Sequence, residues 1–317
     1  MVDSLRLERI KGESILCNVE LNGLKPQDWL FENRNLIDEH LNGHGALLLR
    51  GIKVLSSMQF GKLLNAAFGE NLLEYTYRST PRTELKGFVY SATEYHSDQV
   101  ILQHNENAYS DKWPMRIGFV SMLPATTGGE TPIGCSRNIF ASIPEEIKSE
   151  FSKKGICYIR NYGDVDLPWQ EVFGTTNKAE VDKFCSQRNI KTIWKPDGKL
   201  QTAQVNPAIR KHPVNGEEIW FNQAHLFHYS ALEKSVQDNL LASLSVDDLP
   251  RHVKFGDGTE IDISYLDLIR GIFQENLLTF SWEKHDILLL DNMLWTHGRA
   301  PFSGNRKTLV GMARTQM

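Results

Sequence analysis

Hydrophobic and polar positions in the first seventy residues predict two helices with a buried strand between them. Apolar side chains recur at roughly helical spacing over residues 26–41, and the glycines of 43–45 mark the end of this helix. Residues 46–51 contain a continuous apolar run, which is typical of a buried strand. A second helix is expected over 56–68, because serines precede it and Gly69 follows it.

The rest of the chain predicts mostly strands, with a few short helices between them. Residues 72–136 are rich in Thr, Tyr, Val and Ile with turn residues among them, and 117–123 is the clearest strand. Further strands are expected at 156–159, 218–221, 287–290 and 307–313, and helices at 144–153, 177–188 and 263–278. This order predicts a mainly β chain with helices (α+β), built as a β-sandwich or jelly roll decorated with helices.

Length and composition agree with one large domain. The chain has 317 residues, of which 41% are hydrophobic and 23% charged, as in ordinary globular proteins. No internal repeat, low-complexity tract or long Pro/Gly/Ser linker divides it. Residues 1–317 are therefore expected to form a single domain, with about 1–40 as an N-terminal extension packed on the core.

Charge, apolar runs and cysteines exclude several classes of protein. A net charge of −4 offers no basic surface to nucleic acid, and no run approaches the roughly 18 apolar residues of a membrane span. The N-terminus is too polar and acidic for a secretory signal. The four cysteines are scattered without CxxC pairs, which favours reduced thiols over a disulfide framework or a zinc cluster. We therefore expect a cytoplasmic protein that binds neither nucleic acid nor membrane.

The leading candidate for chemistry is a set of three metal-ligating residues. His104 and Glu106 are two positions apart, and such residues point to the same face of an extended strand. His297 follows an apolar strand far downstream and could supply a third ligand. Two histidines and one carboxylate form the facial triad of non-haem Fe(II) oxygenases. The alternative is that these residues bind no metal, because solvated histidines are common and a His-x-Glu pair often arises by chance.

Arg306 adds a second component to this candidate site. It lies nine residues after His297 and just before the last predicted strand. Its planar guanidinium could bind the far carboxylate of a diacid cosubstrate through two parallel hydrogen bonds. The alternative is a surface salt bridge, which the position after His297 disfavours.

Six ordered motifs give the chain a resemblance to a known family. They lie at 77–82, 89–95, 104–106, 128–133, 220–225 and 291–306. In them the chain resembles the TauD/TfdA family of Fe(II)/2-oxoglutarate dioxygenases, and most closely its SyrP-like branch, over roughly residues 40–317. The resemblance implies a double-stranded β-helix, the cupin-like form of jelly roll, that uses Fe(II), 2-oxoglutarate and dioxygen. It also implies that His104, Glu106 and His297 bind iron, and that Thr131 and Arg306 hold the far carboxylate of 2-oxoglutarate.

Two departures from the family pattern narrow the reaction. Glu106 stands where Asp is more usual, and related halogenases carry Gly or Ala there so that chloride can bind. The carboxylate therefore favours hydroxylation or desaturation over halogenation. Taurine-type members bind a sulfonate with an Arg four residues beyond the cosubstrate Arg, whereas this chain has Val310. A sulfonate substrate is therefore not expected.

Polar residues elsewhere are candidates for the substrate side. Glu94 and Tyr95 precede the metal motif and could contact the substrate, although a structural role is about equally expected. Asn222 and His225 resemble cavity-lining residues of the SyrP-like branch. A second metal between His225 and His228 is conceivable on a helix, but packing among aromatic side chains is favoured because no carboxylate or Cys matches.

Other residues could support the candidate ligands. A metal-bound histidine usually donates its other ring N–H to an acceptor, and Asp291 and Asn292 are both near in sequence. Arg299 either braces the turn after His297 or contacts a ligand. The two glycines before Thr131 are expected to shape the turn that carries it.

These observations predict an Fe(II)/2-oxoglutarate-dependent oxygenase that hydroxylates an unactivated C–H bond of an amino acid or amino-acid-derived metabolite. The resemblance places it in secondary-metabolite biosynthesis, such as antibiotic biosynthesis, and adds a peptidyl carrier protein as a candidate partner that tethers the substrate. One alternative is a dioxygenase acting on a free small molecule. Another is a catalytically silent jelly-roll binding protein.

Overall fold

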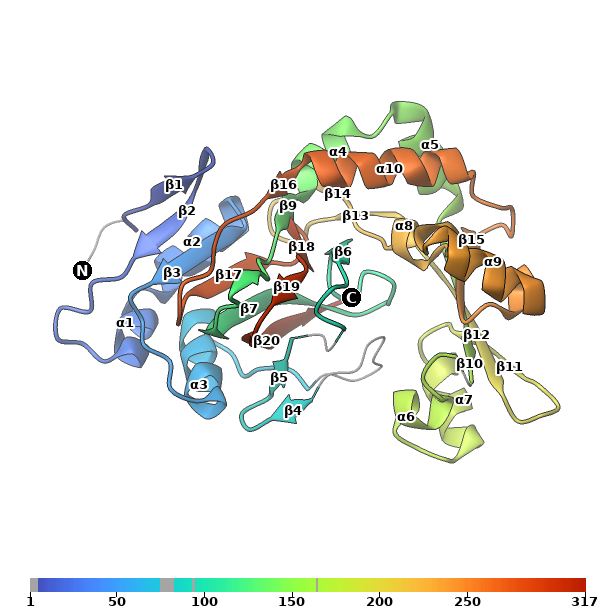
Figure 1. Ribbon diagram of the computed structural model, residues 1–317, viewed down its shortest axis with the longest axis horizontal. Helices are drawn as coiled ribbons and strands as arrows, with labels where there is room; N and C mark the ends of the chain where they lie inside the picture. The colour runs from blue at the N-terminus through green and yellow to red at the C-terminus, as the bar shows by residue number, and fades with distance from the viewer. Residues whose placement is uncertain (1–4, 75–82, 93–94, 164) are drawn as a thin grey trace.

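Two facing β-sheets form the centre of the molecule (Figure 1). The computed structural model describes residues 5–74, 83–92, 95–163 and 165–317. In spatial order, the strands of the large sheet are β1 (Glu8–Ile10), β2 (Glu13–Asn18), β3 (Ala46–Arg50), β17 (Ile287–Asp291), β7 (Trp113–Leu123), β20 (Lys307–Gln316), β5 (Val89–Ser91) and β4 (Glu84–Leu85). Those of the small sheet are β16 (Leu277–Leu278), β9 (Ile133–Cys135), β18 (Trp295–Arg299) and β6 (Ile101–His104).

Strand β17 shows why the central strands are apolar throughout. Successive side chains of a strand point to opposite faces. Leu288 and Leu290 pack in the core between the two sheets, whereas Ile287 and Leu289 pack in a second core under the N-terminal helices. All four are at most 1% exposed. Because both faces of the sheet are covered, the strand carries no alternating polar face.

Three helices cover the outer face of the large sheet: α1 (Pro26–Glu32), α2 (Arg34–Gly43) and α3 (Ser57–Phe68). The sequence predicts one helix over 26–41, and this is wrong in one respect, because the helix is interrupted at Asn33. The side-chain amide of Asn33 donates to the carbonyl of Trp29 at 2.9 Å, and the chain starts a new helix there. The start of α3 is as predicted, since Ser56 accepts a hydrogen bond from the backbone N–H of Gln59.

A large insertion leaves and re-enters the jelly roll at two paired strands. Strand β9 ends at Cys135 and β16 begins at Leu277, and these two strands pair in antiparallel fashion. The chain between them carries its own sheet, in the order β11 (Lys191–Trp194), β12 (Leu200–Asn206), β10 (Ile156–Tyr162) and β15 (Arg251–Phe255), and a separate hairpin of β13 (Ile209–Lys211) and β14 (Glu218–Trp220). Its helices are α4 (Ser136–Ser142), α5 (Glu145–Lys154), α6 (Trp169–Phe173), α7 (Lys178–Ser186), α8 (Ala224–Phe227), α9 (Lys234–Ser243) and α10 (Ile263–Glu275).

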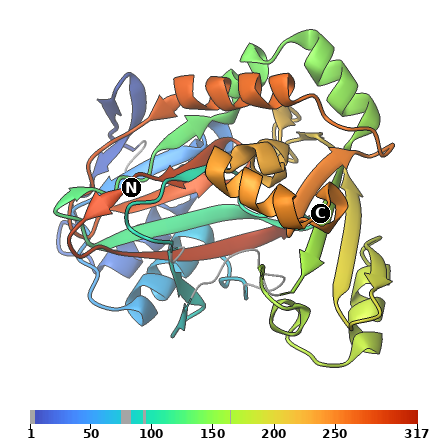
Figure 2. The ribbon, with the colours of Figure 1, turned by 45° about the vertical axis from the view of Figure 1, so that its right-hand side comes forward.

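The insertion lies to one side of the jelly roll and has its own hydrophobic core (Figures 1 and 2). Strand β10 alternates buried and half-buried positions along its length, as expected for a sheet with one well-covered face. The alternation is therefore clear in this sheet and absent from the central strands of the jelly roll. This contrast follows from how many faces each sheet has covered.

The predicted mixed fold with a jelly-roll core is confirmed, and most predicted elements coincide with observed ones. The prediction of mostly strand over 72–136 is partly wrong, because irregular chain occupies 95–100 and 105–112 and a helix begins at Ser136. The N-terminal strands join the large sheet, where β2 runs parallel to β3. Among the described residues, no helix has the length and apolar character needed to cross a bilayer.

Candidate metal centre

His104 and His297 are brought together by strand pairing. His104 is the last residue of β6, and His297 lies at the middle of β18. The two are directly opposite each other in the antiparallel pair, and their ring centroids are 4.5 Å apart. Residues opposite each other on one face of a sheet are within side-chain contact, so the small sheet alone aligns both imidazoles.

Glu106 reaches the same point from a turn rather than from the strand. The prediction that residues 104 and 106 share a strand face is wrong, because β6 ends at His104 and the chain turns through Asn107 at a φ of 57°. The carboxylate still points to the histidines, with its Oε2 3.6 Å from Nε2 of His297. One donor atom from each of the three residues lies within 4.8 Å of the others.

Asn292 holds the backbone of Glu106 in this position. Its side-chain Oδ1 accepts a hydrogen bond from the N–H of Glu106 at 2.7 Å, and its Nδ2 donates to the carbonyl of Glu106 at 2.9 Å. The same amide donates to the carbonyl of Pro114 at 2.8 Å, which joins the turn to strand β7. All of these groups are buried, so each lost bond would leave an unsatisfied polar group.

Asp291 supports the site differently, through the turn between β17 and β18. Its Oδ1 accepts hydrogen bonds from the backbone N–H groups of Met293 and Leu294. Its Oδ2 is bound by Arg116 and lies 3.1 Å from Nε2 of His212. Among the described residues, neither of the two therefore accepts a ring N–H of His104 or His297, as considered from the sequence. Asn292 holds the backbone of Glu106, and Asp291 shapes the turn that leads to His297.

The three side chains fit a divalent cation. Nδ1 of His104 lies 2.8 Å from the carbonyl of Leu102, which favours the tautomer that leaves Nε2 free to ligate a metal. Glu106 and His297 are each only 4% exposed. A buried carboxylate is costly without a cation, and two imidazoles with one carboxylate are the donor set of non-haem Fe(II).

A small cavity on one side of this cluster contains Arg306. Its lining includes Thr131, His297 and Val310 as well as Phe119 of β7. The Arg306 Nε donates to the carbonyl of Gly129 at 2.8 Å, and its Nη2 lies 3.5 Å from Oγ1 of Thr131.

Arg306 is a partly buried cation beside this cluster. Within the described part of the chain no carboxylate forms an ion pair with it, and burial lowers the pKa of its guanidinium to about 10, with the nearby Arg299 cation adding to the effect. The group is still charged at neutral pH. An anionic ligand is the natural partner for such a group, because it restores the charge balance lost on burial.

The glycine turn before Thr131 brings the backbone against this arginine. Gly128 and Gly129 have φ values of 68° and 73°, which residues other than glycine rarely adopt. A Cβ on Gly129 would lie 2.9 Å from Cδ of Arg306, and one on Gly128 would lie 2.2 Å from the carbonyl oxygen of Pro301. Both positions therefore require glycine.

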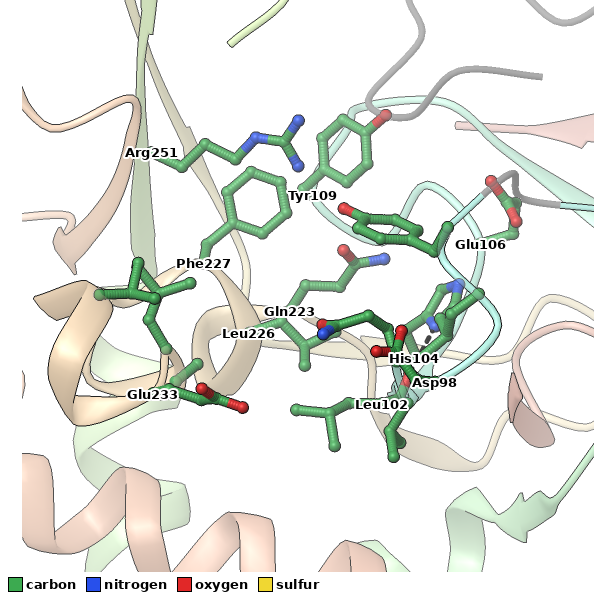
Figure 3. A pocket seen from close by; sticks show the side chains of 17 residues that line it. Asp98, Leu102, His104, Glu106, Tyr109, Gln223, Leu226, Phe227, Glu233 and Arg251 are labelled. Carbon is green, nitrogen blue, oxygen red and sulfur yellow. Dashed lines mark hydrogen bonds between the residues drawn. The ribbon is translucent and has the colours of Figure 1, made fainter. Parts of the chain in front are cut away.

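A larger cavity of about 550 Å³ opens on the other side of the cluster (Figure 3). His104 and Glu106 form one wall, and Phe227 and Arg251 of the insertion lie opposite. Apolar and charged side chains both contribute, as in a site for a small polar molecule. The lining residues of this cavity that carry charge or aromatic rings are Tyr95, Asp98, Tyr109, Phe227, Glu233 and Arg251, besides the two metal-cluster residues.

The candidate substrate residues from the sequence are only partly in this cavity. Tyr95 lines it, whereas Glu94 lies outside the described residues. The expectation that Asn222 and His225 line it differs from the structure. The amide of Asn222 donates to the carbonyl of Ala208, and Nε2 of His225 lies 3.0 Å from the carbonyl of Gln103, so both side chains face the interior.

Arg299 braces a different segment from the one expected. Its guanidinium donates to the carbonyls of Tyr95, His96 and Gln99, which fixes the loop that forms the rim of the large cavity. The sequence offered the turn after His297 as the braced segment, and the side chain also lines the small cavity.

Several cavity residues were not found from the sequence, among them Gln223, Glu233 and Arg251. All three belong to the insertion. No local pattern marks them, because they approach the metal cluster only after the insertion folds back.

Comparison with known proteins agrees with this geometry. The family model of "Taurine catabolism dioxygenase TauD, TfdA family" matches residues 10–313. The chain is 43% identical over 283 residues to the dapdiamide synthesis protein DdaC of Enterobacter agglomerans, covering 89% of this chain and 86% of that protein.

Solved structures show the same fold at low sequence identity. AAD-2 in complex with Mn(II) and N-oxalylglycine superposes with a TM-score of 0.57 at 11% identity, covering 100% of this chain and 99% of that one. PvcB of Pseudomonas aeruginosa gives a TM-score of 0.54 at 15% identity, covering 98% and 92%. The chain belongs to the TauD/TfdA family, and it is an Fe(II)- and 2-oxoglutarate-dependent dioxygenase.

Proposed function

We propose that this dioxygenase hydroxylates an unactivated C–H bond of an amino acid or amino-acid-derived metabolite in secondary-metabolite biosynthesis. His104, Glu106 and His297 bind the iron in this proposal, and Arg306 with Thr131 binds the far carboxylate of 2-oxoglutarate. The observation that carries it is the position of the three donor atoms, within 4.8 Å of one another and between two cavities. One cavity contains the partly buried Arg306, and the other has room for a substrate.

Some residues of the site bind the cosubstrate, and others keep water out of the substrate cavity. When bound, Fe(II) and 2-oxoglutarate supply the oxidising chemistry, in which dioxygen is consumed and the keto acid becomes succinate and carbon dioxide. Arg306 orients the cosubstrate, because its guanidinium is held by the carbonyl of Gly129. Val310, which is 1% exposed, presents an apolar surface beside it. Leu226 and Phe227 add apolar surface to the substrate cavity and help to keep it dry.

The charges in the large cavity support an amino-acid-type substrate. Asp98 and Glu233 offer negative groups to the ammonium of an amino acid, whereas the guanidinium of Arg251 is already paired with Asp166. A substrate that carries an ammonium can use these carboxylates, which a purely apolar substrate cannot do. DdaC is named for the synthesis of dapdiamide, and PvcB is described as an oxygenase from an isonitrile synthetic pathway. Both names favour a biosynthetic role.

The test is a panel of amino acids, each supplied free and as a thioester of a peptidyl carrier protein. We expect succinate formation coupled to the gain of one oxygen atom in one substrate, measured by mass spectrometry. Activity with free amino acids alone would favour the alternative of a free small-molecule substrate. Loss of two hydrogens instead of gain of oxygen would show desaturation.

A second measurement isolates the metal and cosubstrate sites from the choice of substrate. Anaerobic addition of Fe(II) and 2-oxoglutarate should give the visible charge-transfer band of the chelate in the wild type. The band should be absent from H297A and should require more 2-oxoglutarate in R306K. An unchanged band in both variants would overturn the assignment of these residues.

A further inference from the structure

A second cluster of two histidines and a glutamate lies behind the wall of the large cavity. His228 follows α8, His252 is the second residue of β15, and Glu260 lies in the loop before α10. One donor atom from each lies within 4.8 Å of the others. The two imidazole centroids are 4.9 Å apart, and the ring of Tyr229 stacks near both.

We propose that His228, His252 and Glu260 form a second divalent metal site, suited to Zn²⁺, that joins α8 to β15. Two imidazoles and one carboxylate, with a fourth position open to water, are a zinc donor set. Glu260 is 60% exposed at its side chain, so water can reach that fourth position. This site differs from the pairing of His225 with His228 weighed from the sequence, because the partner of His228 comes from a strand distant in the chain.

The surroundings of His228 suit a ligand. Its Nδ1 accepts a hydrogen bond from the backbone N–H of Ser230 at 3.2 Å and lies 2.8 Å from Oγ of the same residue. A metal on Nε2 would shift the ring proton to Nδ1, where Oγ of Ser230 can accept it. Ser230 Oγ is itself held by Arg270, whose Nη2 donates to it at 2.9 Å.

His252 and Glu260 complete the site. His252 is fully buried, with Nε2 3.4 Å from Oε2 of Glu260, and among the described residues its Nδ1 has no hydrogen-bond partner. The other carboxylate oxygen of Glu260 lies 2.9 Å from Nζ of Lys254. A carboxylate that binds a metal with one oxygen and a hydrogen-bond donor with the other is a common arrangement.

The position of the cluster indicates what a metal there would do. Phe227 and Arg251, the chain neighbours of His228 and His252, line the large cavity, whereas none of the three cluster residues is in the described lining of either cavity. A metal at this point would therefore not meet the substrate. It would fasten two segments of the cavity wall to each other, with Phe227 and Arg251 held on the opposite side.

The test counts bound metal in variants that separate the two clusters. Chelator-treated protein is titrated with Zn²⁺, and metal per chain is measured after gel filtration. The expected values are two for the wild type, one for Glu260→Gln and one for H297A, with none for the double variant H297A/E260Q. Glu260 is exposed, so its substitution should not impair folding. The matched control is Glu171→Gln, an exposed glutamate on α6 that should leave two metals bound.

Co²⁺ gives an independent readout of the same site. In the H297A background we expect visible absorption bands typical of four-coordinate cobalt, and E260Q should weaken this binding at least 10-fold, because even the loss of a residue that supports a ligand costs about 10-fold to 100-fold. Equal metal content in the wild type and E260Q would overturn the second site. That result would leave the iron site untouched, since H297A tests the iron site separately.

Discussion

The two clusters have the same three residue types and opposite surroundings. Glu106 is 4% exposed and held by Asn292, and its cluster lies between the small cavity that contains Arg306 and a larger one. Glu260 is 60% exposed at its side chain and contacts Lys254. Among the described residues, the same three residue types therefore occur in two settings, one bordering both cavities and one bordering neither. Access for a cosubstrate and a substrate, together with a rigidly held carboxylate, distinguishes the first cluster.

The largest effect is expected from removing the buried carboxylate. Glu106→Ala should reduce substrate-coupled succinate formation at least about 100-fold, more than the loss of a supporting residue, because a direct metal ligand is lost. Initial rates at saturating 2-oxoglutarate measure this. Glu171→Ala is the control for an exposed carboxylate and should retain the wild-type rate. Retention of activity in Glu106→Ala would remove the distinction between the clusters.

The second-largest effect is expected at Arg306, in the small cavity beside the first cluster. The described lining of this cavity includes no residue of the second cluster. Arg306→Lys keeps the charge but loses the planar pair of donors. We expect the KM for 2-oxoglutarate to rise about 30-fold, since one charge-assisted hydrogen bond contributes about 2 kcal/mol. The exposed neighbour Lys307 provides the control, and Lys307→Gln should leave the KM unchanged. A purely structural Arg306 would instead lower the free energy of unfolding without changing this KM.

A third prediction tests how firmly Glu106 is held. Asn292→Ala leaves the buried N–H and carbonyl of Glu106 without their partners. We expect the free energy of unfolding to fall by about 2 kcal/mol and Fe(II) affinity to fall about 10-fold. Denaturant titration and anaerobic Fe(II) binding measure the two effects. A loss of stability with unchanged iron affinity would show that Asn292 does not position the ligand.

The smallest effect is expected from removing the charge of Lys254, which contacts the exposed carboxylate of Glu260 in the second cluster. Lys254 contacts Glu260 and Asp247 near the surface, where ion pairs are screened by solvent. Lys254→Gln should change the free energy of unfolding by less than about 1 kcal/mol in metal-free protein. Chemical denaturation checks this value. A loss comparable to that of Asn292→Ala would show that the second carboxylate is held as firmly as the first.

Local patterns in the sequence predicted the parts of the fold that depend on neighbouring residues. The caps of α3 at Ser56 and Gly69 and the apolar run of β17 are examples. The three residues of the first cluster and Arg306 were also found, because ordered motifs carry them. The turn position of Glu106 was not predicted, since its backbone is held by Asn292, which is distant along the chain. The break at Asn33 was also missed, although its hydrogen bond to Trp29 is local.

The sequence by itself determined the mainly β core and singled out two histidines and a glutamate as candidate iron ligands, with an arginine as the candidate partner of a diacid. The tertiary structure alone decided which polar residues face the cavity. It turned Asn222 and His225 inward, brought Arg251 and Glu233 to the cavity, and matched His228 with His252. The physical reason is that these residues lie in an insertion whose position depends on packing between distant segments, and no local periodicity encodes that packing.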